Sequence, residues 1–388
     1  MQFSSHFAQF TSETLRKSSV IEMESKRNIT DLPLEILDLL FGYCGDSTNK
    51  VYLAVTHPYL VQGFVYHCRN SIEYLYFNAE ISLSFWRTIL PVCGSYIKGI
   101  VRCIANNIDD HAELSDLISL HCTKLEKIKL FFVMDDISWV KSLICQVQST
   151  LRDIELKVLL NKMNSKMLHE FPELPLLERL CIFNIPVDNY YHIRKFENLV
   201  ELQIGCSDIG IDIDILVLCA PLKKLRIMHL RDVRIIATEQ NEVHLSVIPL
   251  EELLLSGCEI LIEFPACFKL KTIDLMDNVE KNVGALEQLI FSQERSLESL
   301  SFERFLNNEI FIDIIQSFPK LRYLYLPVLN VKIDLEFVRQ IVDILRGNGV
   351  TPKNPFVLKV NQYNRKYKHL LRWLKFISHP ELIKVEYL

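Results

Sequence analysis

A six-residue pattern, L-x-x-L-x-L, recurs through most of this 388-residue chain. Successive clear copies begin 26, 26, 22, 23, 28, 20, 27 and 24 residues apart. The clear copies begin at Leu125, Leu151, Leu177, Leu199, Leu222, Leu250, Leu270, Leu297 and Leu321, and weaker ones at Ile72, Ile97 and Leu382. A period of this length indicates one supersecondary unit that is stacked many times.

The spacing inside each copy predicts a strand. In LEKIKL at 125–130, Ile128 and Leu130 are two residues apart, so on a strand both point to the same side. The first leucine, Leu125, enters from the preceding turn. One repeat cannot bury three such residues alone, whereas a stack of repeats can.

The segments between these strands are predicted to be helices, because their apolar residues recur at helical spacing. A proline often precedes the next strand and ends the helix, because it disfavours helical backbone in the residue before it. Strand, turn and helix, repeated about nine to twelve times, predict an α/β solenoid with a parallel sheet on its concave face and helices on its convex face. The helical sets are Ile137, Val140, Ile144 and Val147; Leu286, Leu289 and Ile290; and Ile310, Ile314, Ile315 and Phe318; the prolines are Pro175, Pro221, Pro249 and Pro319.

Residues 69–330 resemble leucine-rich-repeat proteins, whose period is about 20–29 residues. The copy at Leu250 continues as LEELLLSGCEI and matches L-x-x-L-x-L-x-x-C-x-I through Cys258 and Ile260. Asn278 and Ser207 occupy the same ninth position in two other copies, but most copies have an apolar residue there. Since a polar ninth residue normally satisfies loop backbone groups, some loops must do this differently.

A different segment precedes the repeats, RNITDLPLEILDLLFGYC at 27–44. Thr30 and Asp31 are good helix starters, and Pro33 fits a first helical turn. The apolar residues that follow are too many for one buried stripe. We therefore expect a short helix that packs on its own core with one side and contacts something else with the other.

The core of this segment, Leu-Pro-Leu-Glu-Ile-Leu at 32–37, resembles the opening of an F-box, and residues 50–64 resemble a weaker second half. The tryptophan often found near the end of that half is absent, and Thr56-His57-Pro58-Tyr59 stands in its place. The resemblance covers 29–68 and implies a non-catalytic adaptor of an SCF-type ubiquitin ligase, which docks on a Skp-type linker protein and through it on a cullin. The docking residues that it implies are Leu32, Pro33, Ile36, Leu37, Leu40 and Phe41. The alternative is a buried helix of a helical domain.

The two ends of the chain differ from the repeats. Residues 1–28 are polar and are predicted to be a disordered tail, and Met23 is a second possible start. Residues 331–388 read as atypical repeats, with a helix at 331–346, a strand FVLKV at 356–360 and a basic amphipathic helix at 365–376. That last helix either covers the final repeat with Leu370, Trp373 and Leu374 or binds an anionic or membrane surface.

Composition and motifs exclude several function classes. The net charge is -5 with acids and bases mixed throughout, which argues against nucleic acid or membrane as the partner. The 11 cysteines form no CxxC pair, so buried free thiols in a cytoplasmic or nuclear protein are expected, with no metal site. We find no phosphate-binding glycine motif and no catalytic signature, and we expect neither a cofactor nor catalytic residues.

Binding is the expected role of the concave face, where aromatic and arginine side chains would anchor a protein target. Two other functions stay open: a non-ligase scaffold whose N-terminal helices cap the solenoid, and an enzyme with an unrecognised polar pocket. The candidate target-binding residues are Phe131, Arg179, Phe183, Arg226, His229, Tyr323 and Tyr325.

Overall fold

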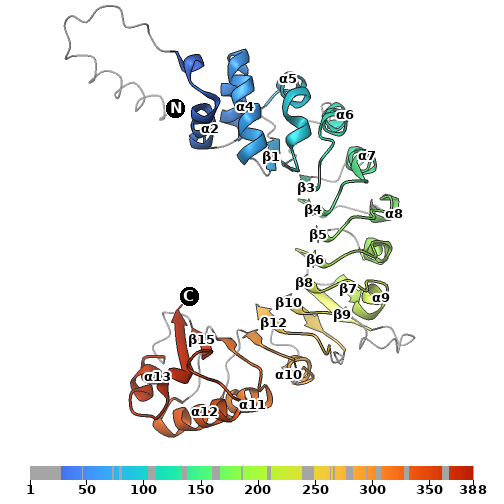
Figure 1. The fold of residues 1–388 in the computed structure, drawn as a ribbon. Helices are drawn as coiled ribbons and strands as arrows, with labels where there is room; N and C mark the ends of the chain where they lie inside the picture. The colour runs from blue at the N-terminus through green and yellow to red at the C-terminus, as the bar shows by residue number, and fades with distance from the viewer. Residues whose placement is uncertain are drawn as a thin grey trace, which may run out of the picture. The chain divides into compact units, whose positions relative to one another are not determined.

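The computed structural model describes most of the chain outside its first 27 residues. It divides into two compact units, Met1–Ile72 and Glu73–Leu388, which we describe separately (Figure 1). The described residues are 28–45, 47–71, 74–77, 81–103, 111–132, 138–159, 167–184, 187–207, 211–237, 249–262, 264, 267–276, 283–293, 296–302, 307–326, 332–360 and 367–387.

The first unit is helical. Its described elements are the 3₁₀ helix η2 (Ile29–Asp31) and the helices α2 (Leu34–Tyr43), α3 (Ser47–Val55) and α4 (Pro58–Ser71). Thr30 and Asp31 were predicted to start the helix, but α2 starts a few residues later, with Pro33 as its N-cap. The Asp31 carboxylate instead accepts the Asn28 N–H at 2.7 Å, at the start of η2. The chain turns between the two helices, and the hydroxyl of Tyr59 in α4 donates to the Leu32 carbonyl at 2.8 Å.

The core of this unit lies where α2 and α4 meet. Phe41 is fully buried, and its ring centroid is 5.5 Å from that of Phe64. Gly63 permits the close approach, because a Cβ there would lie 2.8 Å from Leu37 Cδ1 and 3.3 Å from Phe41 Cε2. Because this contact would be so short, a larger residue at 63 must displace the side chain of Leu37.

A polar chain centred on the buried His67 joins the three α-helices of this unit. His67 on α4 lies with Nδ1 2.6 Å from the Asp38 carboxylate of α2 and Nε2 3.1 Å from the Lys50 ammonium of α3. An ammonium group can only donate, so Nε2 accepts and Nδ1 carries the proton toward Asp38. The buried imidazole therefore has a partner on both sides.

The second unit is built on one parallel sheet, which contains 13 strands within the described residues. Strands that follow one another in the sequence are neighbours in this sheet, except that the short strands β7, β9 and β11 form a separate sheet. Within this unit the strands line one side and the helices line the other (Figure 1). In sheet order the strands are β1 (Tyr74–Phe77), β2 (Gly99–Cys103), β3 (Lys127–Phe132), β4 (Asp153–Val158), β5 (Arg179–Phe183), β6 (Glu201–Gly205), β8 (Ile227–Arg231), β10 (Glu252–Ser256), β12 (Thr272–Met276), β13 (Ser299–Phe302), β14 (Tyr323–Leu326), β15 (Phe356–Val360) and β16 (Ile383–Tyr387).

The register stacks the predicted inward positions. Ile128 pairs with Ile154, which pairs with Leu180, and all three are fully buried. Burying each such side chain contributes about 1.5–3 kcal/mol. The recurring leucines are thus the core of the unit, which is a leucine-rich-repeat solenoid.

One predicted copy has the wrong phase. Ile227 pairs with Glu201 on the helix-free side, and Met228 and Leu230 are the buried pair of β8. The repeat therefore begins at Leu225 and not at Leu222. Leu222 and Leu225 are three residues apart and both are buried, so the sequence pattern allowed the repeat to begin at either one.

The helical side is more varied than the sequence suggests. The predicted helices over 138–147, 283–291 and 308–317 are confirmed, whereas Ile137 lies outside the described residues. Around the middle repeats a second, three-stranded parallel sheet replaces long helices; it consists of β7 (Ile211–Asp214), β9 (Val233–Ile236) and β11 (Glu259–Ile260). The remaining elements are α5 (Leu83–Cys93), η3 (Gly94–Tyr96), α6 (His111–His121), α7 (Ser138–Val147), α8 (Met167–Glu170), η4 (Val187–Lys195), α9 (Ile215–Cys219), α10 (Val283–Phe291), α11 (Asn308–Ser317), α12 (Leu335–Gly347), α13 (Tyr367–Leu374) and η7 (Pro380–Leu382).

The turns after the strands show how loops without a polar ninth residue are satisfied. In the copy that begins at Leu177, Asn184 occupies the eighth position and has φ 60°. Its side-chain amide nitrogen donates to the Val158 carbonyl at 2.9 Å, and its amide oxygen accepts the Ser207 N–H at 2.6 Å. Gly257 has φ 64° in the equivalent turn, where a Cβ would overlap the Asp232 carboxylate, so a larger residue would require that side chain to move. The Cys258 thiol donates to the Leu230 carbonyl at 3.2 Å.

The C-terminal elements continue the same sheet. FVLKV forms the predicted strand, β15, which pairs with β14 and β16. The long helix starts later than expected, at Leu335, where Asp334 accepts the Phe337 N–H at 2.9 Å as its N-cap. Leu370 and Leu374 of α13 are buried, and Lys368 and Arg372 are exposed, so α13 covers the unit as the capping alternative predicts. Trp373, the third predicted covering residue, is only half-buried.

Candidate functional site

Helix α2 presents apolar side chains on two sides. Leu37 and Phe41, one turn apart, are 1% and 0% exposed and belong to the core of the first unit. Ile36, Leu39 and Tyr43, at spacings of three and four residues, are 41%, 59% and 87% exposed. We call these three residues the α2 stripe. Exposed apolar residues that cluster on one helix face mark a contact surface.

The implied docking set therefore needs a correction. Leu37 and Phe41 are unavailable to a partner, because they fill the space against α4. Ile36 and Pro33 are exposed, and Leu32 and Leu40 are half-buried. Leu39 and Tyr43 were not in that set. Their spacing of three and seven residues from Ile36 places them on the same helix face, so the sequence could have indicated them.

The second surface is the helix-free face of the 13-stranded sheet, which we call the open face. Side chains alternate along each strand, so the open face carries rows of every second residue. One row runs through Lys129, Glu155, Cys181, Gln203 and His229, which the register places side by side on consecutive strands. A neighbouring row contains Asp153, Arg179 and Glu201.

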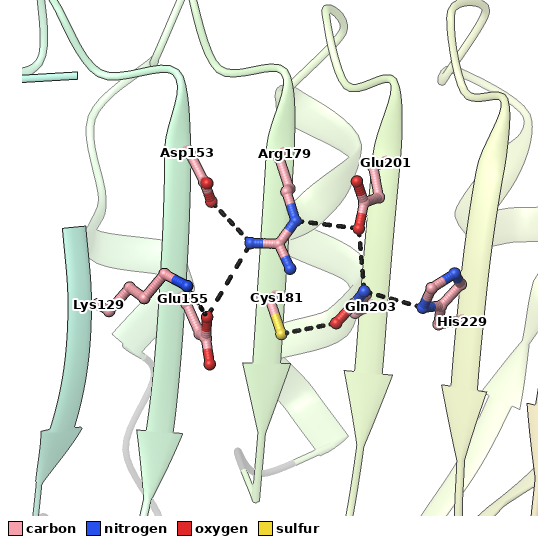
Figure 2. A network of polar contacts seen from close by, with 8 residues as sticks. All are labelled: Lys129, Asp153, Glu155, Arg179, Cys181, Glu201, Gln203 and His229. Carbon is pink, nitrogen blue, oxygen red and sulfur yellow. Dashed lines mark hydrogen bonds and ion pairs between the residues drawn. The ribbon is translucent and has the colours of Figure 1, made fainter. Parts of the chain in front are cut away.

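A continuous polar network joins these two rows across β3 to β8 (Figure 2). Arg179 is its centre: Nη1 lies 2.9 Å from the Asp153 carboxylate and Nε 2.9 Å from that of Glu201. Glu155 lies 4.0 Å from the same guanidinium and 3.3 Å from the Lys129 ammonium. The expected anchor Arg179 is thus already paired, and it organises the acids around it.

The network continues to a neutral histidine. The Gln203 amide donates to Glu201 Oε1 at 2.9 Å and lies 2.8 Å from His229 Nδ1. Since an amide nitrogen cannot accept, His229 Nδ1 is the acceptor, and the ring proton sits on Nε2. Burial lowers the pKa of His229 below its ordinary value of 6.5, although the nearby carboxylates oppose the shift.

The buried thiols are poor nucleophiles. Cys181 donates to Gln203 Oε1 at 3.1 Å, and burial, assisted by the charge of Glu155, raises its pKa to about 12. Burial also raises the pKa of Cys122 to about 12 and that of Cys258 to about 11. Eight described cysteines are buried thiols, as predicted, whereas Cys44 and Cys145 are half-buried. Cys122, Cys181 and Cys258 are protonated at neutral pH.

Aromatic rings on the open face lie next to lysines. Tyr74 has the Lys129 ammonium 5.1 Å from its ring centroid. The Phe183 ring, which lies against the Cα of Gly205, has Lys157 at 6.0 Å. Among the remaining predicted anchors, Phe131 is paired with Lys157 in the sheet register. Tyr323 is exposed, and the Lys359 ammonium lies 5.9 Å from its ring centroid. Tyr325 lies two residues farther along the same strand.

Arg226 does not belong to these rows. It precedes β8, where its N–H donates to the Val200 carbonyl at 2.8 Å, and its guanidinium is 3.8 Å from Glu251. Arg226 was predicted to lie on the open face because the predicted repeat begins at Leu222 and not at Leu225. It instead shares the edge before the strands with the Arg152–Glu178 pair at 2.7 Å and the Lys271–Glu251 pair at 3.2 Å.

Two kinds of feature are absent from the described part of the chain. Within it, no group of three or more His, Cys, Asp or Glu side chains is arranged to hold a metal ion. No described helix combines the length and the apolar character that are needed to cross a membrane.

Comparison with known proteins finds solved structures that share the fold at low sequence identity, among them two complexes. No family model matches the chain, and no curated protein does. The yeast Rad7 and Elc1 complex aligns over 93% of this chain and 91% of its own, with a TM-score of 0.46 and 15% identity. The TLR13–ssRNA13 complex aligns over 78% of this chain at 14% identity with a TM-score of 0.43, and this chain spans about half of its length, 48%.

Removing the centre of the network should cost stability. Arg179→Met keeps the aliphatic stem but leaves Asp153 and Glu201 without their cation, and breaking such a partly buried group costs about 2 kcal/mol. Urea unfolding of the full chain measures the loss. The matched control is Arg152→Met, whose pair with Glu178 is solvent-exposed and is worth about 0–1 kcal/mol. Equal effects of the two substitutions would contradict the role of Arg179.

The lowered pKa of His229 predicts a pH dependence with a definite sign. The unfolded chain takes up a proton at His229 near pH 6.5, before the folded chain does. This contribution to stability is therefore complete above pH 6.5 and is lost as the pH falls below it. The thermal midpoint of the wild type should fall more than that of His229→Gln between neutral and mildly acidic pH, whereas parallel curves would contradict the prediction.

Proposed function

We propose that this chain is the substrate-recognition adaptor of an SCF-type ubiquitin ligase. The α2 stripe carries the proposal: a short helix keeps Leu37 and Phe41 for its own core and leaves Ile36, Leu39 and Tyr43 to water. Large apolar side chains at a surface lose contact with water when a partner covers them, which favours association. The resemblance of residues 29–68 to an F-box supports a Skp-type linker as that partner.

In this proposal the open face holds the protein target. Aromatic rings beside lysines at Tyr74, Phe183 and Tyr323 suit a target segment with carboxylates next to apolar side chains. The adaptor does no chemistry itself. It brings the lysines of the target near a ubiquitin-loaded enzyme, which accelerates transfer by raising their effective concentration.

Co-expression with a Skp-type linker protein tests the proposal. The full chain and residues 73–388 are each affinity-tagged and purified, and the co-purified linker is quantified. Recovery of the linker with the full chain alone supports docking through the first unit. Recovery with both chains contradicts the assigned surface, and recovery with neither contradicts the ligase function and leaves a scaffold role.

A further inference from the structure

Strand β16 is an edge of the 13-stranded sheet. It pairs with β15 in parallel over its whole length, from Phe356–Ile383 to Val360–Tyr387, and no other described strand pairs with its opposite edge. It follows β15 at the C-terminal, red end of the second unit (Figure 1). A strand edge with available backbone N–H and C=O groups can pair with another strand.

The side chains of β16 carry opposite charges on one face. Lys384 and Glu386, two residues apart, lie on the same side with Nζ 2.7 Å from Oε1. Their neighbour Val385 points to the other side. The register places Lys359 beside Glu386 and Val357 beside Lys384. The exposed charges on this strand are therefore one cation and one anion, arranged symmetrically about Val385.

This symmetry matters for pairing with a second copy of the same strand. A two-fold axis that joins two edge strands side by side runs them antiparallel and keeps equivalent faces on the same side of the joined sheet. Directly opposite residues then share a face, so only registers shifted by two residues are allowed. If Lys384 were opposite itself, two cations would meet, and if Glu386 were opposite itself, two anions would meet.

The register centred on Val385 avoids both conflicts. Lys384 lies opposite Glu386 of the second copy, Glu386 lies opposite Lys384 of the second copy, and the two Val385 side chains face each other. This register also pairs all five residues of the strand. Each Glu386 then lies between Lys359 of its own chain and Lys384 of the other. Opposite charges directly across an antiparallel pair stabilise it, and like charges oppose it.

We propose that β16 binds β16 of a second copy of this chain in this register, which makes the protein a symmetric dimer joined edge to edge. The dimer goes beyond the proposed adaptor function and does not depend on it. It presents two open faces on the same side of one continuous sheet, so a target with two recognition segments would be held twice.

Charge exchange tests the register. Sedimentation equilibrium of the full wild-type chain, from low micromolar to the highest soluble concentration, should show a monomer–dimer equilibrium. Lys384→Glu alone or Glu386→Lys alone should weaken the dimer by roughly ten-fold or more, because both cross-strand pairs become like-charged. The double variant Lys384→Glu with Glu386→Lys should dimerise more tightly than either single variant, because both cross-strand pairs are again oppositely charged.

Mixing the two single variants separates the dimer from effects within one chain. Tagged Lys384→Glu should capture untagged Glu386→Lys, since opposite charges meet only between the two chains, and it should not capture its own untagged form. Thermal unfolding of each variant checks that the substitution leaves the chain folded. A wild type that stays monomeric overturns the proposal, and so do single variants that dimerise like the wild type or a mixture that gives no mixed dimer.

Discussion

Replacing Ile36 and Leu39 by aspartate is expected to abolish co-purification of a Skp-type linker with the full chain. Both side chains are exposed on the α2 stripe, so neither supports the core of the first unit. Losing two buried apolar contacts at an interface costs about 3–6 kcal/mol, which weakens binding by roughly two to four orders of magnitude. Quantitative pull-down of the linker measures the loss.

The control applies the same chemical change elsewhere. Val92 on α5 and Leu120 on α6 are also exposed apolar residues, but they lie in the second unit. Val92→Asp with Leu120→Asp should leave linker recovery unchanged. Circular dichroism should show native helix content in both double variants. Full linker recovery with a folded Ile36→Asp, Leu39→Asp chain would show that the α2 stripe does not bind the linker, which contradicts the proposed function.

Phe41→Ala is expected to unfold the first unit while the solenoid stays folded. Phe41 is fully buried between Phe64 and the ring of His67, whose centroid is 5.8 Å away. Truncating a buried phenylalanine costs about 3–5 kcal/mol, because the cavity adds to the lost burial. A unit this small has little stability to lose. Hydrogen exchange of the full chain should show lost protection in α2 and α4 and native protection in β4 and β5.

The matched control is Phe376→Ala. Phe376 is exposed in the second unit, so the same truncation opens no cavity, and protection should stay native throughout. Retained protection of α2 in Phe41→Ala would show that Phe41 is no part of a cooperative core. Loss of protection in β4 and β5 as well would show that the two compact units unfold together.

Much of the fold was predictable because most strands of the sheet carry the same short sequence pattern, L-x-x-L-x-L or a close variant of it. The inward positions of β3, β4 and β5 follow from leucines spaced by three and two residues, and period and strand direction follow from the stack. The phase at Leu222 failed because Leu222 and Leu225 satisfy the same pattern. The second sheet of β7, β9 and β11 was missed, since short apolar runs do not distinguish a strand from a turn of helix.

The candidate surfaces were predictable only in part. The sequence by itself determined that a short helix follows Pro33 and carries too many apolar residues for one buried stripe. It also determined that aromatic and basic side chains recur on the strands. Only the tertiary structure decided that Leu37 and Phe41 turn inward while Leu39 and Tyr43 face water, because that choice depends on where α4 packs.

The same division holds on the solenoid. The sequence determined the period and therefore which residues share a row. Pairing across the sheet then decided that Arg179 is held by Asp153 and Glu201, residues 26 and 22 positions away. Side-chain partners on neighbouring strands depend on register and rotamer, which are properties of the packed sheet and not of any one repeat.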